Sequence, residues 1–369
     1  MIRMISGSIL IKVTLLVLVI LWAPAVSLAD EIPLFYQGIR PLGMGGAFTA
    51  VAGDENAFFY NPAGLLRRGG EVEFELLAIP TLELGQDLLD IYQEGKQIND
   101  TRNESEKTDK VIDLIGQSFG DKFYLKASLF PHLIYNQIGV GFLAQGSARS
   151  TIHNPLGSNF VEAKATADLA VLLSYARPVG AQDRPTYIGI TAKGVNRRVF
   201  EKSYTLREIS EPNEDKNDIK EGTGVAIDLG FLHDYPMSAT LQPTVGLSLQ
   251  NIVGGDIGNA GKLPFQANVG VAFEQKMKRG DFLLAADIVD LTRNVGNDNN
   301  FTKRLHIGME YQFPYILALR TGLYQGSPSY GMTVDFWIIH FHYAYYVEEI
   351  GAFAGQIPDA RHVVKIALF

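Results

Sequence analysis

Apolar and polar residues alternate along many segments of this chain, and that period of two most constrains its fold. In residues 223–232, "TGVAIDLGFL", Val225, Ile227 and Leu229 share one face, while Asp228 and Gly230 lie on the other. A period of two is typical of β-strands with one apolar face. The same period recurs in residues 244–250, 304–312, 316–324 and 338–347. The sequence therefore predicts an all-β protein.

Two architectures share this period. In a soluble sandwich the apolar face points inward, whereas in a transmembrane barrel it meets lipid and the polar face lines the lumen. Two features favour the barrel. The candidate strands are near ten residues long, and the chain has 16 Tyr and 21 Phe residues. The chain ends at Phe369, as expected for the C-terminal assembly signal of outer-membrane barrels, although Lys365 stands in phase with it where an apolar residue is usual.

The N-terminus predicts export. Arg3 and Lys12 precede an apolar run, residues 13–22, that is too short to span a bilayer. Ser27 and Ala29 fit a small-x-small cleavage site, so residues 1–29 read as a signal peptide cut after Ala29. The alternative is an uncleaved anchor. The chain has no cysteine, which excludes a lipoprotein anchor, disulfides and thiolate metal sites.

Strand counting predicts a closed barrel over residues 67–369. Loops and turns alternate between long and short, as in outer-membrane barrels with long loops outside and short periplasmic turns. The longest connection, residues 80–121, is expected to be extracellular and to carry a short surface helix near residues 110–119. The candidate strands number about fourteen and are 71–79, 122–130, 134–148, 160–177, 185–202, 222–234, 241–252, 264–275, 280–291, 303–312, 315–324, 328–337, 338–348 and 361–369.

Charge and motifs exclude several function classes. The formal net charge of −8 argues against nucleic acid as a partner, because phosphate binding needs a basic face. The chain has no G-x-S-x-G elbow, and we expect no enzymatic activity and no cofactor. His340 and His342 share a face and could hold a metal, but polar residues of the lumen are the favoured interpretation, so we expect no metal.

Residues 30–66 differ from the rest of the chain, because they are rich in glycine and small residues. About eight strands is the size at which wall side chains alone fill a barrel, so a fourteen-stranded barrel needs a plug. We expect this segment to fold back into the lumen as a hatch. Glycines permit its turns, Asp54 can cap a turn, and Asn61 with Pro62 matches a helix start. The predicted hatch residues are Gly43, Gly45, Gly46, Asp54, Asn61, Pro62 and Gly64.

Two blocks of sequence resemble a known family. Residues 42–65, "LGMGGAFTAVAGDENAFFYNPAGL", resemble the N-terminal hatch of FadL-type outer-membrane proteins, and more closely the PorV and TraF-like branch of that superfamily. Residues 319–369 resemble the ending of the same branch, where "FHYAYYVEEIG" is followed by "PDARH". His342 stands where an acidic residue is common, which puts any role of that position in doubt.

The resemblance implies a fourteen-stranded outer-membrane barrel with a hatch, and it leaves two functions open. In one, a hydrophobic small molecule, fatty-acid-like or hydrocarbon-like, enters from outside, passes a pocket above the hatch and leaves sideways through a kinked strand. In the other, the barrel is a PorV-like accessory or shuttle of a protein secretion system. The expected partners are outer-membrane lipid and either the small molecule or secretion proteins. The aromatic residues available to an apolar ligand on the hatch are Phe48, Phe58, Phe59 and Tyr60.

The charged residues on the polar strand face also allow two interpretations. They form either a paired network that holds the hatch, which we favour, or a selective ion path. These residues are Lys164, Asp168, Lys193, Asp228, Asp287, Glu310, Arg320 and Asp335.

Overall fold

A computed structural model of the chain describes most of the sequence after the N-terminal segment. The described residues are 34–68, 72–75, 79–99, 104–153, 160–180, 184–205, 208, 219–235, 237–238, 240–295, 300–336 and 339–368. The expected signal peptide and Phe369 lie outside them, so both expectations stay predictions. Among the described helices, none has the length and apolar character to cross a membrane.

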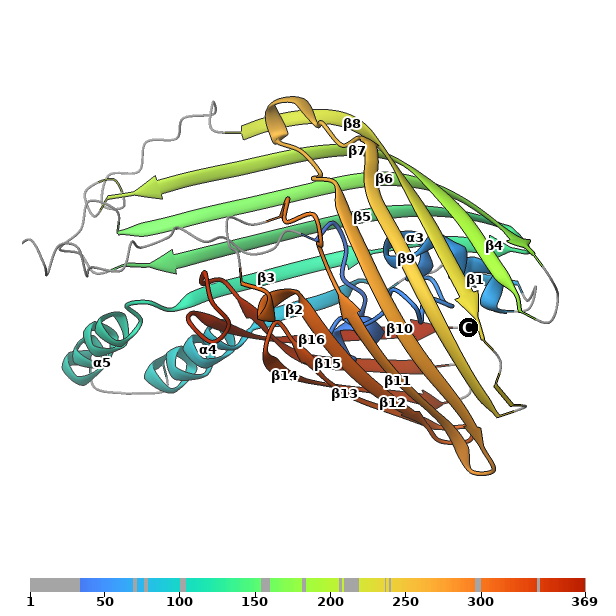
Figure 1. Ribbon diagram of the computed structural model, residues 1–369. Helices are drawn as coiled ribbons and strands as arrows, with labels where there is room; N and C mark the ends of the chain where they lie inside the picture. Colours follow the sequence, from blue (N-terminus) through green and yellow to red (C-terminus); the bar gives the residue numbers. More distant parts are fainter. Residues whose placement is uncertain are drawn as a thin grey trace, which may run out of the picture.

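The strands form one closed antiparallel barrel of fourteen strands, as the alternating pattern predicts (Figure 1). Each wall strand pairs with the next one along the chain, and pairing of β2 in the first strand with β16, the last strand, closes the circle. The labelled strands are β1 (Glu73–Glu75), β2 (Thr81–Gly85), β3 (Lys122–Leu129), β4 (His132–Tyr135), β5 (Ile138–Ile152), β6 (Val161–Val179), β7 (Thr186–Tyr204), β8 (Ile219–Asp234), β9 (Leu241–Gly254), β10 (Gln266–Met277), β11 (Gly280–Ile288), β12 (Leu305–Gln312), β13 (Leu317–Tyr324), β14 (Ser327–Phe336), β15 (Ile339–Glu349) and β16 (Pro358–Leu368).

Two of the fourteen wall strands are interrupted, which is why sixteen strands are labelled. β3 and β4 keep one register against β5 across Phe130 and Pro131, because Leu129 pairs with Ala144 and His132 with Gly141. Pro131 has no N–H to donate to the ladder. β1 and β2 do not keep one register: Glu75 pairs with His132 and Thr81 with Ser128, so the register differs by two residues between them. The first wall strand is therefore irregular at this point.

The alternation along each strand separates two faces of the wall. On β8, Leu229 and Phe231 are exposed on the outer face, whereas Asp228 is buried on the lumen side. The apolar outer band and the polar inner face are those of a transmembrane barrel. The structure confirms the lumen face for the predicted charges, of which six are buried: Asp168, Lys193, Asp228, Asp287, Glu310 and Arg320.

The connections differ from the sequence expectation in the longest loop. The first wall strand continues through β2 to Gly85. Within β2, Glu83 points to the lumen while Leu82 and Leu84 point outward, which is the alternation of a wall strand. Two helices then follow, α4 (Gln86–Asn99) and α5 (Glu104–Gln117), where a single short helix was expected. They lie side by side beyond the ends of β2 and β3 (Figure 1). We call this end of the barrel the long-loop end. Its extracellular position stays a prediction.

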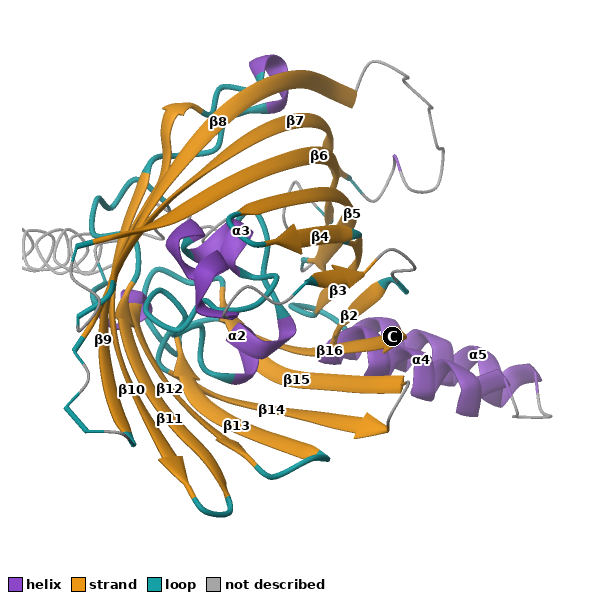
Figure 2. Ribbon diagram, turned by 90° about the vertical axis from the view of Figure 1, so that its right-hand side faces the viewer, coloured by secondary structure: helices purple, strands orange, loops and turns teal. Residues whose placement is uncertain are grey.

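The N-terminal segment lies inside the barrel (Figure 2). It contains α2 (Ile39–Gly43), α3 (Ala57–Tyr60) and the 3-10 helix η1 (Pro62–Arg68). Its apolar side chains have no exposed surface at several positions, among them Leu42, Met44 and Phe58. We call residues 34–68 the hatch. The other two 3-10 helices of the described chain, η3 (Gly258–Ala260) and η4 (Thr302–Arg304), belong to loops at the long-loop end.

Candidate functional site

Glycines of the wall let the hatch approach its backbone closely. At seven of them, a Cβ atom would lie closer than 3.0 Å to an atom of the hatch. Any larger side chain would therefore push against the hatch. We call these seven the glycine belt, and they come from seven different strands: Gly139, Gly189, Gly230, Gly246, Gly308, Gly322 and Gly331. The belt runs around most of the barrel, so the hatch is fitted to the wall on nearly all sides.

Buried ion pairs also hold the hatch. The guanidinium of Arg40, in α2, donates to both carboxylate oxygens of Glu310 on β12, at 2.6 and 2.9 Å. Arg40 also reaches Asp54 within the hatch at 3.0 Å. Arg320 on β13 pairs with the same Glu310 and donates to Thr333. A buried charge is tolerated only when it is paired, so this network favours one position of the hatch.

A wall carboxylate holds the backbone of the hatch. One oxygen of Asp287, on β11, accepts hydrogen bonds from the N–H groups of Phe48 and Thr49, both at 2.7 Å. His306 on β12 contacts the carbonyl oxygen of Gly45 at 2.5 Å. Together with the ion pairs, these contacts agree with the interpretation that the lumen charges form a paired network.

Asn61 joins the hatch to itself and to the wall. Its side-chain oxygen accepts the N–H of Ala63 at 3.2 Å, and η1 begins at Pro62, the position that the sequence assigns to a helix start. Its amide nitrogen donates to the carbonyl oxygens of Thr49, at 2.8 Å, and of Phe231 on β8, at 3.2 Å. Asn61 therefore caps η1 and bridges to the wall at once.

The other predicted hatch residues lie at turns and close contacts. Gly45 and Gly46 have φ angles of 65° and 81°, the left-handed region that favours glycine. A Cβ at Gly43 would meet Gly331 of the wall at 2.9 Å, and one at Gly64 would collide with the carbonyl of Ala52. Asp54 accepts the N–H of Asn56 at 3.0 Å and so closes a turn. Their part in closing the barrel stays a prediction.

The aromatic residues of the hatch divide into two pairs. Phe48 and Phe58 are fully buried, Phe48 against Tyr60 of the hatch and Phe58 against Phe130 of the wall, and they line none of the described cavities. Phe59 and Tyr60 line a cavity of about 30 Å³, too small for a ligand and about the share of one water molecule. A role for these four residues in ligand binding stays a prediction.

A larger chamber lies between the hatch and the long-loop end. Its volume is about 400 Å³, which falls among small-molecule sites of roughly 300–1,000 Å³. Leu34, Phe35 and Val199 give it apolar surface. Its other lining is rich in cations, six against the two acids Asp168 and Glu201: Lys126, Arg149, Lys164, Arg197, Lys220 and Lys262. Of this lining, only Lys164 and Asp168 are placed on the lumen face by sequence periodicity. Only the fold brings five strands and the loop between β9 and β10 together around one space.

Hydrogen bonds tie the chamber to the hatch. Arg197 forms a two-point ion pair with Asp168, at 2.6 and 3.0 Å. Gln145 donates to Asp168 at 3.0 Å and to the carbonyl oxygen of Phe35 at 2.8 Å. Lys164 lies 3.8 Å from Glu201. The described lining of the chamber thus has an excess of positively charged residues. It also makes a polar contact with the N-terminal part of the hatch.

A hollow on the outer face backs onto the chamber. It has a volume of about 470 Å³, and we call it the Pro80 hollow. Gln145, Gly146 and Asp168 line both this hollow and the chamber, so one layer of strands separates the two. Its outward side chains are small at Ala127 and Ala144. The hollow also lies beside the irregular part of the first wall strand.

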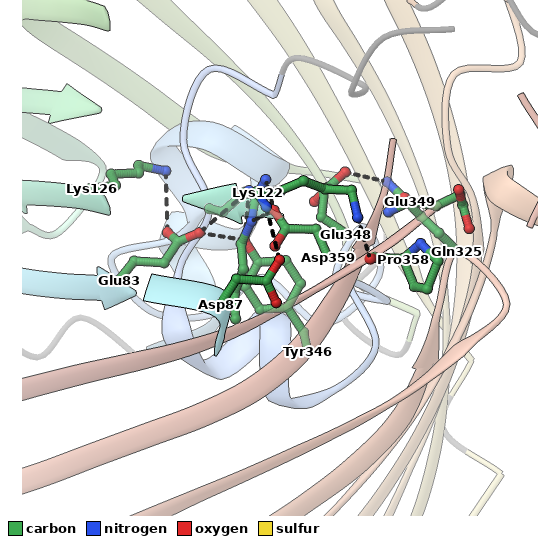
Figure 3. Close-up of polar contacts among 12 residues, drawn as sticks. Glu83, Asp87, Lys122, Lys126, Gln325, Tyr346, Glu348, Glu349, Pro358 and Asp359 are labelled. Carbon is green, nitrogen blue, oxygen red and sulfur yellow. Dashed lines mark hydrogen bonds and ion pairs between the residues drawn. The ribbon is translucent and has the colours of Figure 1, made fainter. Parts of the chain in front are cut away.

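A polar cluster joins the first and last strands of the barrel on the chamber side (Figure 3). β2 and β16 share only four backbone pairs, so side chains supply further contacts. Arg361, fully buried, lies 2.8 Å from Asp359 and 3.7 Å from Glu83, and Lys126 lies 3.7 Å from the same Glu83. Glu349 accepts four backbone N–H groups of the loop between β15 and β16. The "EEIG" and "PDARH" motifs thus have structural roles at the seam.

The two neighbouring histidines lie on the lumen face of β15, as their spacing predicts. Nδ1 of His340 is 2.5 Å from Asp335, and Nδ1 of His342 is 3.0 Å from Thr333. In the part of the chain that the structure describes, no group of three or more potential ligands could hold a metal ion.

Comparison with known proteins identifies the fold. No protein-family model matches the chain, and no curated protein matches it. Among solved structures, it is similar to the CymD monoaromatic hydrocarbon channel, with a TM-score of 0.51 and 12% identity over 92% of this chain and 99% of that one. It is also similar to the Ralstonia pickettii toluene transporter TbuX, with a TM-score of 0.51 and 11% identity over 91% and 99%. The shared fold is the fourteen-stranded barrel.

Proposed function

We propose that this protein is an outer-membrane channel for a small amphipathic acid, a molecule with an apolar body and a carboxylate, such as a fatty acid. The observation that carries the proposal is the chamber, which joins apolar surface to an excess of lysine and arginine above the hatch. Arginine and lysine are the side chains that bind carboxylates. The similar barrels carry a monoaromatic hydrocarbon or toluene by their titles, and both molecules have an apolar body but no charge.

The route proposed for the ligand ends at the side of the barrel. The hatch fills the lumen below the chamber and is fitted to the wall by the glycine belt. The thin wall between the chamber and the Pro80 hollow supports a sideways exit into the membrane. Passive transfer of this kind needs no catalytic residue and no cofactor.

Calorimetry with matched ligands tests the proposal. Purified protein in detergent is titrated with laurate and with 1-dodecanol, which share a chain length and differ in charge. Laurate should bind at least tenfold more tightly. Lys262→Gln, at the chamber, should weaken the binding of laurate about tenfold, because one charge-assisted hydrogen bond is lost. The binding of 1-dodecanol should be unchanged. Lys276→Gln, at the opposite end of the barrel, is the control.

Equal binding of the two ligands, unaffected by either substitution, would contradict the proposal.

The resemblance also allows a PorV-like accessory role in protein secretion. A stoichiometric protein partner that co-purifies with the chain, in place of a bound small molecule, would support that second function.

A further inference from the structure

We infer a binding site for one membrane phospholipid on the outer face of the barrel, across β6, β7, β8 and β9. A hollow of about 370 Å³ lies there, apart from the chamber and from the Pro80 hollow, and we call it the Arg177 hollow. Its lining is apolar except for one cation. The lining residues are Tyr175, Arg177, Ile188, Gly189, Ile190, Leu229, Gly230, Phe231, Leu247 and Leu249.

Strand register arranges the outward side chains of this hollow in two rows. One row crosses the four strands as Tyr175, Ile190, Leu229 and Leu249. The next row crosses them as Arg177, Ile188, Phe231 and Leu247. The paired glycines Gly189 and Gly230 lie between the rows and form the floor, directly outside the Asn61-Pro62 turn of the hatch. The floor has no side chains, which leaves room for a chain-shaped apolar ligand.

The polar end of the hollow fits a phosphate group. Arg177 is exposed there and makes no ion pair among the described residues. In the next row towards the short-turn end, Thr186 and His233 pair across β7 and β8 and are joined by a hydrogen bond of 2.6 Å. Tyr235, beyond them, contacts the ring of His233 edge-on, with the ring centroids 4.2 Å apart. A cation with a tyrosine at the edge of an apolar band is typical of the membrane–water interface.

These features identify the occupant by its chemistry. The hollow faces outward from a transmembrane wall, so an acyl chain is the apolar group that meets it. The guanidinium at one end is complementary to the lipid phosphate. A phospholipid of the leaflet on the short-turn side satisfies both requirements. This inference does not rest on the proposed function, because the site lies on the outer face and shares no residue with the chamber.

Native mass spectrometry of the full chain with added phosphatidylglycerol tests the site. The unaltered protein should retain one phospholipid. In Arg177→Gln and in Leu247→Trp, the occupancy of this phospholipid should be at least tenfold lower. Arg279→Gln and Leu319→Trp are matched controls, since each alters an exposed side chain that lines none of the described hollows. The heat-modifiable shift on gels reports folding of every variant.

Three results would overturn the inference. One is equal retention of lipid by folded protein of all five forms. Another is an unaltered protein that retains no lipid. The third is a dimer of the chain that Leu247→Trp disrupts, because a second copy would then occupy the hollow.

Discussion

At the scale of single residues, the glycine belt decides whether the hatch fits. Sequence periodicity places Gly230 and Gly246 on the lumen face, but it gives no reason for glycine there. The reason is non-local: a Cβ at Gly230 would collide with Asn61, 169 positions earlier in the chain. A single sequence shows which face a residue occupies, but it does not show which distant segment packs against that face.

The contact between Gly230 and Asn61 leads to a prediction that compares two glycines of neighbouring strands. Gly230→Ala should displace the Asn61-Pro62 turn, since the new Cβ would lie 2.1 Å from Oδ1 of Asn61 and 2.8 Å from the backbone nitrogen of Ala63. Gly194→Ala, on β7, is the control, because nothing lies within 4 Å of its Cβ position. Hydrogen exchange of residues 44–65 should accelerate about tenfold or more in Gly230→Ala only. Equal exchange in both variants would show that the belt does not hold the hatch.

At the scale of elements, the wall strands were largely predictable and their irregularities were not. Each strand carries its own period of two, so most of the fourteen candidate segments overlap observed strands. The interruption between β1 and β2 depends on register against β3 and β4, which no local pattern encodes. β2 was missed because the alternation of residues 81–85 is short, and of the two helices that follow, α4 was missed and only part of α5 was expected.

The thin wall at the Pro80 hollow supports a prediction at this scale. Ala144 faces outward on β5, so Ala144→Trp should fill the hollow and slow transfer of laurate into liposomes, while chamber binding stays unchanged. Ala192→Trp, also outward but lining none of the described hollows, should transfer laurate at the normal rate. Unimpaired transfer by Ala144→Trp would place the exit elsewhere.

At the scale of the whole molecule, the N-terminal segment lies inside a wide barrel. The sequence predicted the fold class, because alternation is a local property. It did not predict the cationic chamber, whose lining comes from residues between 34 and 262 and is assembled only by closure of the barrel. The aromatic ligand contacts were predicted from the composition of the hatch alone and stay a prediction, and two of the four residues, Phe48 and Phe58, line none of the described cavities.

The central claim is that the hatch closes the barrel, and planar-bilayer conductance tests it most directly. The intact protein should be nearly silent, because the hatch is sealed against the wall by the glycine belt, Glu310 and Asp287. Deletion of residues 40–65 should produce a large, stable pore, since wall side chains alone do not fill a fourteen-stranded barrel. An intact protein that already conducts as a large stable pore, with no change after the deletion, would contradict this account.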